Sequence, residues 1–279
     1  MKVLFFGDVF GRPGREALIR ITPRLIAQHE PDFVIANVEN IAHGTGITSS
    51  TLAEIDQTGL FDAYTAGNHL MAKAGVRSVL ADAGIPLVRP INFPSSTPGT
   101  GERVVVKGAK RLLVINALGR VFMKDEVSNP FRALQGVLER YTIDPEEEGK
   151  ERVDGIFVDF HAEATAEKRT FGFFLDGTVS AVVGTHTHVP TRDEHVLEGG
   201  TAYISDVGMV GPSNSSLGLQ KEPMVEEMIQ EAPQGREVGS DPIAEVGAVL
   251  VEIGSNGLAK NIIHIREFVN LDEPAQEGE

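Results

Sequence analysis

Five apolar segments of this sequence end in side chains that commonly bind metal ions. These side chains are Asp8, Glu39, Asn40, Asn68, His161, His186 and His188, with His69 directly after Asn68. His186 and His188 belong to the sequence GTHTH (184–188), so in extended backbone both imidazoles leave on the same side and can reach neighbouring metal ions. The chain has no cysteine, so nitrogen and oxygen atoms must hold any metal.

Taken singly, these residues have ordinary structural interpretations. An aspartate after a glycine, such as Asp8, is often a turn or capping residue, and Asn40 and Asn68 are typical of turns. A single histidine at a strand end often satisfies its donor and acceptor within the protein. Together, a buried cluster of two carboxylates and several imidazoles would combine desolvation with like-charge repulsion, which proteins rarely retain without a function. The complete set therefore favours a metal site.

The segments that carry these residues are predicted β-strands separated by predicted helices. Strands are expected at residues 2–8, 32–40, 62–69, 111–119, 153–161 and 179–188. Helices are expected at Gly14–His29, with a kink at Pro23, and at Thr51–Gln57, Ala72–Ala83, Pro130–Arg140 and Glu163–Leu175. Because the strands are apolar nearly throughout, the alternation predicts an α/β fold with helices on both faces of the sheet structure.

Residues 195–204 and 243–268 are more typical of antiparallel strands, so we expect mixed central β-sheets. No repeat or linker divides the chain, which predicts a single domain over residues 1–268 and a flexible C-terminal tail at 269–279. In open α/β sheets, ligands bind beyond the carboxyl ends of the strands. The strand ends that carry the candidate ligands are therefore expected to converge, although they are widely separated in the sequence.

The composition limits the partners that the protein can have. The chain has 279 residues, 41% of them hydrophobic, which is enough for a substantial core. Its formal net charge of −15 argues against long nucleic acids, which are bound mainly through Lys and Arg, but is compatible with a small phosphate ester. No apolar run approaches the roughly 18 residues of a membrane span, and Asp8 comes too early for a secretory signal. We predict a cytoplasmic protein without a membrane partner. The sequence does not determine whether the chain forms a homo-oligomer.

Five motifs, in order, resemble those of the calcineurin-like metallophosphoesterases. They are GDVFG (7–11), NVEN (37–40), GNH (67–69), DFHAEATAEK (159–168) and GTHTH (184–188). Within that superfamily the chain is similar to the bacterial YmdB-like family of cyclic-nucleotide phosphodiesterases, which YISDVGMVGP (203–212) also resembles. Phe10 and Glu39 stand where the wider superfamily has a histidine and an aspartate. Both replacements are similar to the YmdB-like pattern. Leu70, Met71 and Ala72 depart from the polar residue, tryptophan and acid that usually follow GNH in the subgroup, and their effect on activity stays open.

The resemblance implies the layered metallophosphoesterase fold and a dinuclear metal-dependent phosphodiesterase that acts on 2′,3′- or 3′,5′-cyclic nucleotides. It implies two ions bridged by Glu39, with Asp8, Asn40 and His188 around one and Asn68, His161 and His186 around the other. A hydroxide that bridges the two metals would attack phosphorus in line with the leaving group. Mixed imidazole, carboxylate and amide ligands suit Fe or Mn, with Zn or Co as alternatives. His69 is the expected general acid for the leaving oxygen.

Two other functions compete with this interpretation. One is a phosphomonoesterase or nucleotidase of the same superfamily, and the other is a metal-binding regulatory scaffold with weak activity. Dominant monoester turnover would favour the first, and a purely structural site would not need His69.

Three residues near the candidate site have weaker signals. Arg12 and Arg15, at the start of the first predicted helix, could bind phosphate, but they are equally typical of a solvated helix start. His43 lies in the glycine-rich loop after Asn40 and could contact substrate. Structural or solvated roles are expected for His29, His195 and His264.

Overall fold

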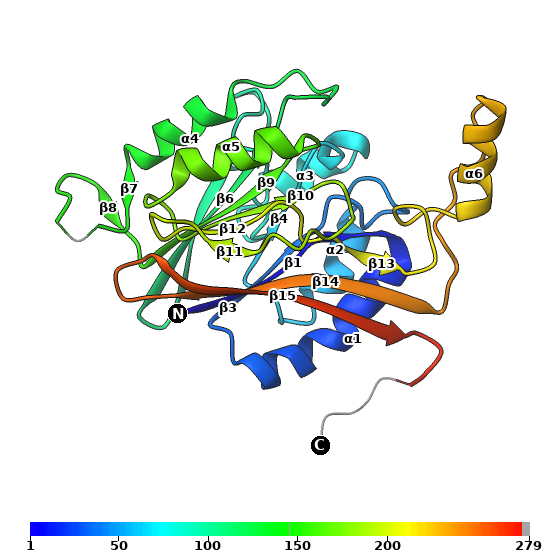
Figure 1. Ribbon diagram of the computed structural model, residues 1–279, viewed down its shortest axis with the longest axis horizontal. Coiled ribbons are helices and arrows are strands. Elements are labelled where there is room, and N and C mark those ends of the chain that lie inside the picture. The colour runs from blue at the N-terminus through cyan, green and yellow to red at the C-terminus, as the bar shows by residue number, and fades with distance from the viewer. Residues whose placement is uncertain (145, 275–279) are drawn as a thin grey trace.

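The computed structural model describes residues 1–144 and 146–274, and its main feature is a pair of β-sheets that pack face to face (Figure 1). The first sheet has the strand order β2-β13-β14-β1-β3-β4, and β15 also pairs with β14. Its strands are β1 (Lys2–Phe6), β2 (Asp8–Val9), β3 (Phe33–Asn37), β4 (Ala63–Thr65), β13 (Met209–Pro212), β14 (Ile243–Ile253) and β15 (Ala259–Asn270).

The second sheet has the strand order β11-β12-β10-β9-β6-β5. Its strands are β5 (Glu102–Lys107), β6 (Lys110–Leu118), β9 (Gly155–His161), β10 (Ala181–Thr185), β11 (His195–Val196) and β12 (Ala202–Ile204). A separate small pair is formed by β7 (Tyr141–Thr142) and β8 (Glu151–Arg152). As expected, the later segments supply antiparallel strands, because β14 runs antiparallel to β1, β13 and β15, and β11 to β12.

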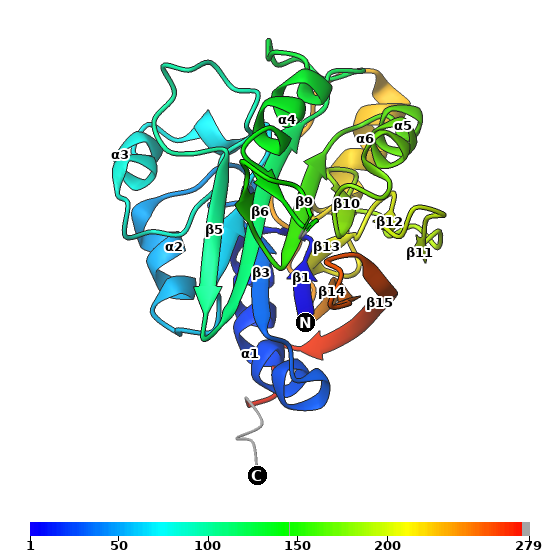
Figure 2. The same ribbon diagram turned by 90° about the vertical axis from the view of Figure 1, so that its left-hand side faces the viewer.

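Helices cover the outer face of each sheet, so the layers run helix, sheet, sheet, helix (Figure 2). The first sheet is covered by α1 (Gly11–His29), α2 (Ser49–Asp56), α3 (Val76–Ala81) and the 3₁₀-helix η1 (Leu70–Ala72). The second is covered by α4 (Pro130–Leu138) and α5 (Thr165–Leu175), whereas α6 (Lys221–Gln230) stands to one side of the layers (Figure 1). This arrangement confirms the predicted fold class of mixed sheets flanked by helices.

The core between the sheets is built from the inward-facing residues of both. Phe5 of β1 and Phe157 of β9 are fully buried, with ring centroids 5.3 Å apart. On the outer side of the second sheet, Phe160 stacks on Phe171 of α5 at 3.9 Å. Since the central strands β1, β3 and β9 are buried on both faces, they read as largely continuous apolar runs rather than alternating ones.

Parallel strands bring the polar strand ends to one edge. In the first sheet β3 runs parallel to β1 and β4, and in the second β9 runs parallel to β6 and β10. Leu118, His161 and Thr185 are in register at the carboxyl ends of β6, β9 and β10. The last residues of these strands, and the loops that follow them, therefore face the same region.

Gly7 divides the first predicted strand in two. β1 ends at Phe6, and Asp8 and Val9 form β2, which pairs with β13. A Cβ at Gly7 would lie 1.9 Å from the carbonyl oxygen of Gly208, so only glycine allows this close approach of backbones. Asp8 then pairs with Met209 of β13, and its side chain accepts the backbone amide of His186, directly after β10 of the second sheet.

The helix boundaries differ from the prediction in several places. The first helix begins at Gly11 and continues past Pro23 to His29, and the fifth begins at Thr165. The segment predicted as one helix at 72–83 is instead η1 and α3. The strand β5 and the helix α6 were not predicted.

At the C-terminal end, β15 continues to Asn270, beyond the domain boundary expected at residue 268. Leu271 then donates its amide to the carbonyl of Pro242. Residues 275–279 of the expected tail lie outside the described residues. Within residues 1–144 and 146–274, every helix falls short of the length and apolarity that crossing a membrane requires.

Candidate metal centre

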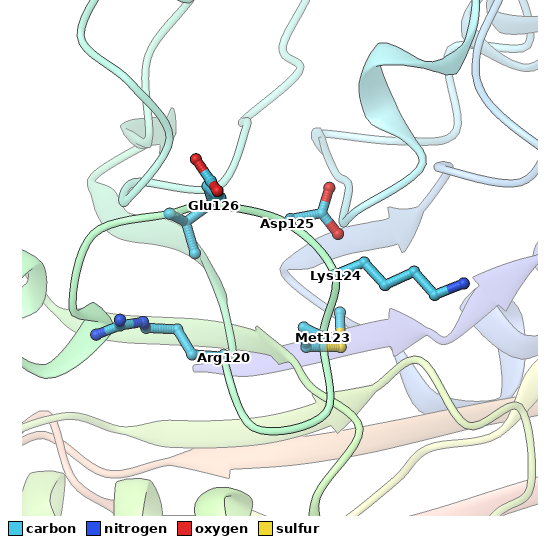
Figure 3. A pocket seen from close by; sticks show the side chains of 6 residues that line it. Arg120, Met123, Lys124, Asp125 and Glu126 are labelled. Carbon is cyan, nitrogen blue, oxygen red and sulfur yellow. The ribbon is translucent and has the colours of Figure 1, made fainter.

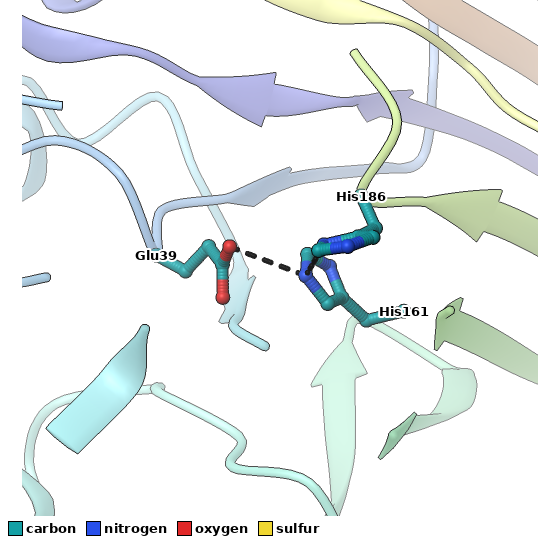
Figure 4. A group of neighbouring side chains, drawn as sticks. All are labelled: Glu39, His161 and His186. Carbon is teal, nitrogen blue, oxygen red and sulfur yellow. Dashed lines mark hydrogen bonds and ion pairs between the residues drawn. The ribbon is translucent and has the colours of Figure 1, made fainter. Parts of the chain in front are cut away.

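All seven candidate ligands, with His69, come together where the strands of the two sheets end. In the first sheet Asp8 begins β2, and Glu39 and Asn68 come shortly after β3 and β4. In the second sheet His161 ends β9 and His186 directly follows β10. One ligand atom from each of Glu39, His161 and His186 lies within 4.8 Å of the other two (Figure 4). The predicted convergence of distant strand ends is therefore present in the fold.

One part of the cluster is centred on Nε2 of His161. This atom lies 3.0 Å from Oδ1 of Asn68, 3.0 Å from Nδ1 of His186 and 3.2 Å from Oε1 of Glu39. Each of these atoms can present a lone pair, and a single proton on His161 cannot be shared well among three acceptors. Four electron-rich atoms this close together fit the binding of a cation.

The second part contains Asp8, Asn40 and His188. Oδ1 of Asp8 is fully buried and has no hydrogen-bond partner among the described residues, and it lies 3.9 Å from Nε2 of His188. A buried carboxylate oxygen without a donor is costly unless a cation binds it. The other oxygen, Oδ2, accepts the backbone amide of His186 at 3.0 Å and so fixes the carboxylate.

Asn40 is turned so that its amide nitrogen faces this second part. Nδ2 lies 3.1 Å from Oε1 of Glu39 and 3.3 Å from Nε2 of His188, whereas Oδ1 lies 2.7 Å from Nδ1 of His69. For Asn40 to present its oxygen to a metal, the amide must rotate by about half a turn. That rotation would exchange the acceptor that faces His69 for a donor.

Each histidine of the cluster has its outer nitrogen bonded to a different acceptor. Nδ1 of His161 lies 2.9 Å from Oγ1 of Thr185, which donates its proton to Asp159 at 2.7 Å. Nε2 of His186 lies 3.1 Å from Oε2 of Glu163. Nδ1 of His188 lies 3.0 Å from the carbonyl oxygen of Leu217. A proton on each outer nitrogen leaves the inner nitrogen free to bind a metal, as partners behind metal ligands generally do.

These outer partners were not among the residues predicted for the site. Three of them, Thr185, Glu163 and Asp159, lie inside the recognised motifs. Their contacts behind the histidines, however, become apparent only in the fold. Leu217 contributes only its backbone oxygen, which no side-chain pattern reveals.

Charge and burial set the protonation of the cluster. Burial, and next the charge of His161, lower the pKa of His186 to about 3, so this ring is neutral near pH 7. Burial alone would raise the pKa of Glu39, but His161 and His69 hold it well below its usual range. Burial raises the pKa of Asp8. Burial alone would lower the pKa of His161, but the charge of Glu39 raises it to about 9. A metal must therefore displace a proton from this ring, because metals bind a neutral imidazole and an ionised carboxylate.

His69 lies at the rim of the cluster, with 39% of its side chain exposed. Its backbone amide donates to Oε2 of Glu39 at 3.0 Å, which fixes where the ring begins. Nδ1 faces Asn40 and Glu39, and Nε2 makes no hydrogen bond within residues 1–144 and 146–274. The hydrogen bond to Glu39 raises the pKa of His69.

The unusual residues after GNH support this orientation. Leu70 is fully buried in the core of the first sheet, and the amide of Ala72 donates to the carbonyl of His69 at 2.9 Å. The η1 turn therefore anchors His69 through an apolar side chain and a backbone bond.

Phe10, in the place of the superfamily histidine, packs beside the cluster. Its ring meets that of His188 edge-on, with centroids 5.5 Å apart. Cβ atoms at Gly44 and Gly218 would lie 2.6 and 2.4 Å from the Phe10 ring, so glycine is needed at both positions. The phenylalanine thus supports one face of His188.

The two arginines at the start of α1 are engaged elsewhere. Arg12 bonds to Glu16 at 2.7 Å with 79% of its side chain exposed. Arg15 bonds to Glu54 and to the carbonyl of Ile41. His43 is exposed on the loop after Asn40. These contacts favour the solvated interpretation of Arg12 and give Arg15 a role in holding the loop.

A cavity of about 440 Å³ lies in the loop that follows β6 (Figure 3). The loop starts beside the cluster, because the amide of Gly119 donates to the carbonyl of His161 at 2.9 Å. The lining residues are Arg120, Met123, Lys124, Asp125, Glu126 and Val127. Sequence reasoning did not single out this loop.

The chain is similar over most of its length to several known proteins. The model of the family described as YmdB-like protein matches residues 4–265. A 2′,3′-cyclic-nucleotide 2′-phosphodiesterase of Bacillus subtilis is 44% identical over 226 residues, which cover 81% of each chain. The crystal structure of a hypothetical protein from Thermus thermophilus has a TM-score of 0.85 and 36% identity, covering 96% of this chain and 99% of that chain. A novel phosphatase of Mycoplasma pneumoniae has a TM-score of 0.86 and 30% identity, covering 96% and 93%.

Proposed function

Because the chain belongs to the YmdB-like family of calcineurin-like metallophosphoesterases, we propose that it is a metal-dependent phosphodiesterase that hydrolyses cyclic nucleotides. One observation carries this proposal: carboxylate, amide and imidazole groups meet around His161, beside a buried oxygen of Asp8 that accepts no hydrogen bond among the described residues. The Bacillus subtilis relative supports 2′,3′-cyclic nucleotides as the first substrates to test, with 3′,5′-cyclic nucleotides next. The cytoplasm is the proposed location.

The proposed ligands form two groups that share Glu39. Asp8, Asn40 and His188 would hold one ion, and Asn68, His161 and His186 the other. Fe or Mn fits this mixed donor set, with Zn or Co as alternatives. When bound, two such ions lower the pKa of water and stabilise the charge that develops on the phosphoryl oxygens.

The protein's own residues would handle the leaving group. The backbone amide of His69 donates to Oε2 of Glu39 at 3.0 Å, and Nδ1 of the ring lies 3.4 Å from Oε1 of Glu39, which leaves Nε2 directed away from this carboxylate. Since the bond to Glu39 raises the pKa of His69, a protonated ring is favoured, and Nε2–H can donate its proton to the departing ester oxygen. We therefore assign His69 as the general acid.

Elemental analysis combined with a substrate panel tests the proposal. Purified protein is analysed for metals, loaded with Mn²⁺ or Fe²⁺, and assayed on cyclic nucleotides, bis-p-nitrophenyl phosphate and p-nitrophenyl phosphate. We expect close to two ions per chain and preferential turnover of diesters. Dominant turnover of the monoester would favour a phosphatase, as the Mycoplasma pneumoniae protein is named. Full metal occupancy without diester turnover would favour the scaffold function.

A further inference from the structure

A buried ion pair lies directly behind the turn that carries His186 and His188. Nζ of Lys168, on α5, donates to Oδ2 of Asp206, in the loop after β12, at 2.7 Å. Lys168 is 2% and Asp206 1% exposed, and charged residues are rarely buried so completely without partners. Neither residue belongs to the proposed ligands.

Asp206 is bonded to the turn itself. Its Oδ2 accepts both the backbone amide of Thr187, at 3.1 Å, and the hydroxyl of Thr187, at 2.8 Å. Its Oδ1 accepts the amide of Gly208 at 2.9 Å. Thr187 lies between His186 and His188, so one carboxylate fixes the residue that joins the two candidate ligands.

The turn needs such a restraint because its backbone is strained. His186 has φ of 102° and His188 has φ of 64°, which side chains other than glycine rarely adopt. Asp8 holds the amide of His186, and Asp206 holds that of the next residue, Thr187. Two carboxylates therefore accept adjacent backbone amides of the turn and stabilise a conformation that side chains other than glycine rarely adopt.

A close approach of backbones brings Asp206 to this place. A Cβ at Gly184 would lie 1.8 Å from the carbonyl oxygen of Ser205 and 3.2 Å from the Lys168 side chain. The glycine that opens GTHTH thus lets the end of β10 pack against the loop that carries Asp206 and against the Lys168 side chain. The motif segments that contain Lys168, Gly184 and Asp206 therefore pack against one another at this glycine.

We propose that Lys168 and Asp206 form a positioning pair that holds Thr187, and through it directs His186 and His188 towards the metal centre. Lys168 compensates the buried charge of Asp206, which keeps that carboxylate an acceptor for the amide and hydroxyl of Thr187. The inference rests on the proposed function, because that proposal makes His186 and His188 metal ligands. Neither residue of the pair hydrogen-bonds to a proposed ligand side chain, and Thr187 is the residue through which Asp206 is bonded to the turn.

The test separates positioning from general stability. The double variant Lys168→Met with Asp206→Leu removes both charges together, and replacing a buried pair by apolar residues is often tolerated by a fold. Thr187→Val removes the hydroxyl bond alone, and Thr187→Ser restores it. Thr201→Val is the matched control, because the buried hydroxyl of Thr201 donates to Val179 at the opposite end of the second sheet.

Two quantities are measured on the same samples. Binding of Mn²⁺ alone is monitored by electron paramagnetic resonance titration, and stability is measured by thermal unfolding. We expect Mn²⁺ affinity to fall about 10- to 100-fold in the double variant and less in Thr187→Val, as for other partners behind metal ligands. Thr187→Ser and Thr201→Val should bind as the wild type does, and the Mn²⁺ spectrum should change only in the first two variants.

Wild-type affinity in a folded double variant and in Thr187→Val would overturn the inference. If the double variant does not fold, Thr187→Val against Thr187→Ser decides the question. Wild-type protein that binds Mn²⁺ but hydrolyses no diester would overturn the proposed function and leave the positioning role standing, because the readout is metal binding.

Discussion

Oε2 of Glu163 lies 3.1 Å from Nε2 of His186, on the side of the ring opposite to His161. The carboxylate thereby favours a proton on Nε2 and a lone pair on Nδ1, the atom that faces the cluster. Glu163 is 47% exposed, so its effect is expected on the orientation of the ring rather than on stability.

Replacing Glu163 should weaken metal binding. We expect Glu163→Ala to lower Mn²⁺ affinity by about 10-fold, whereas Glu163→Gln, which keeps an acceptor oxygen, should lose less. Calorimetric titration with Mn²⁺ measures both. Glu198→Ala, at an exposed glutamate in the β11–β12 turn, is the control. Equal affinities in all four proteins would show that Glu163 does not orient His186.

His69 should affect turnover far more than metal binding. His69→Ala is expected to reduce diester turnover by about 10²- to 10⁴-fold, the usual contribution of a general acid, while Mn²⁺ still binds. His195→Ala, at an exposed histidine of β11, should leave turnover nearly unchanged. Steady-state kinetics on a cyclic nucleotide and on bis-p-nitrophenyl phosphate make the comparison. Undiminished turnover in His69→Ala would remove the acid from the proposed mechanism.

The sequence predicts the fold well where the pattern is local. Apolar runs between helices identify the central strands, and the polar residues at their ends predict a common edge, because parallel strands end together. The extra strand β5 and the helix α6 have no comparably clear pattern. Gly7 could not be identified as a strand break, because its role depends on the backbone of Gly208.

The candidate site likewise contains residues that the sequence predicts and residues that only the fold reveals. Residues that bind metals by their own chemistry, such as His161, can be recognised by type. Lys168 and Asp206 cannot, because a lysine on a helix is usually solvated and only the fold pairs it with a distant aspartate. The partner of His188 is a backbone oxygen, at Leu217, which the sequence does not distinguish from any other.

Asp193 should give the protein a specific sensitivity to acid. Burial alone would raise the pKa of this carboxyl, but hydrogen bonds from Ser205 and Thr191 hold it below its usual range. A lowered folded-state pKa stabilises the fold above the ordinary carboxyl value of about 4, and this stability is lost as pH falls through the lower value. The hydroxyl of Thr191, which donates to Asp193, also accepts the backbone amide of Asp206 at 2.9 Å, so the same bonds reach the positioning pair.

The variant Asp193→Asn should therefore be less stable than the wild type near pH 7, by about 1–2 kcal/mol for the loss of charged hydrogen bonds. The difference should shrink as pH falls below about 4. Urea unfolding at several pH values measures it, with the exposed Asp272→Asn as the control. A difference that does not change with pH would mean that the charge of Asp193 has no part in stability.

Phe10 links stability to the orientation of His188. Its side chain is 5% exposed and fills the space between Gly44 and Gly218, so Phe10→Ala should cost about 3–5 kcal/mol of unfolding free energy. The cavity would also remove the edge-on contact that supports the His188 ring, so Mn²⁺ affinity should fall in protein that is still folded.

Phe10→Leu separates the two effects, because it keeps most of the apolar volume and loses the aromatic edge. We expect it to recover much of the stability but less of the Mn²⁺ affinity. Phe122→Ala, at a side chain that is 85% exposed, should change the unfolding free energy by less than about 0.5 kcal/mol. Urea unfolding and Mn²⁺ titration on the four proteins make the test. If affinity follows stability in every variant, Phe10 supports the fold alone and does not orient His188.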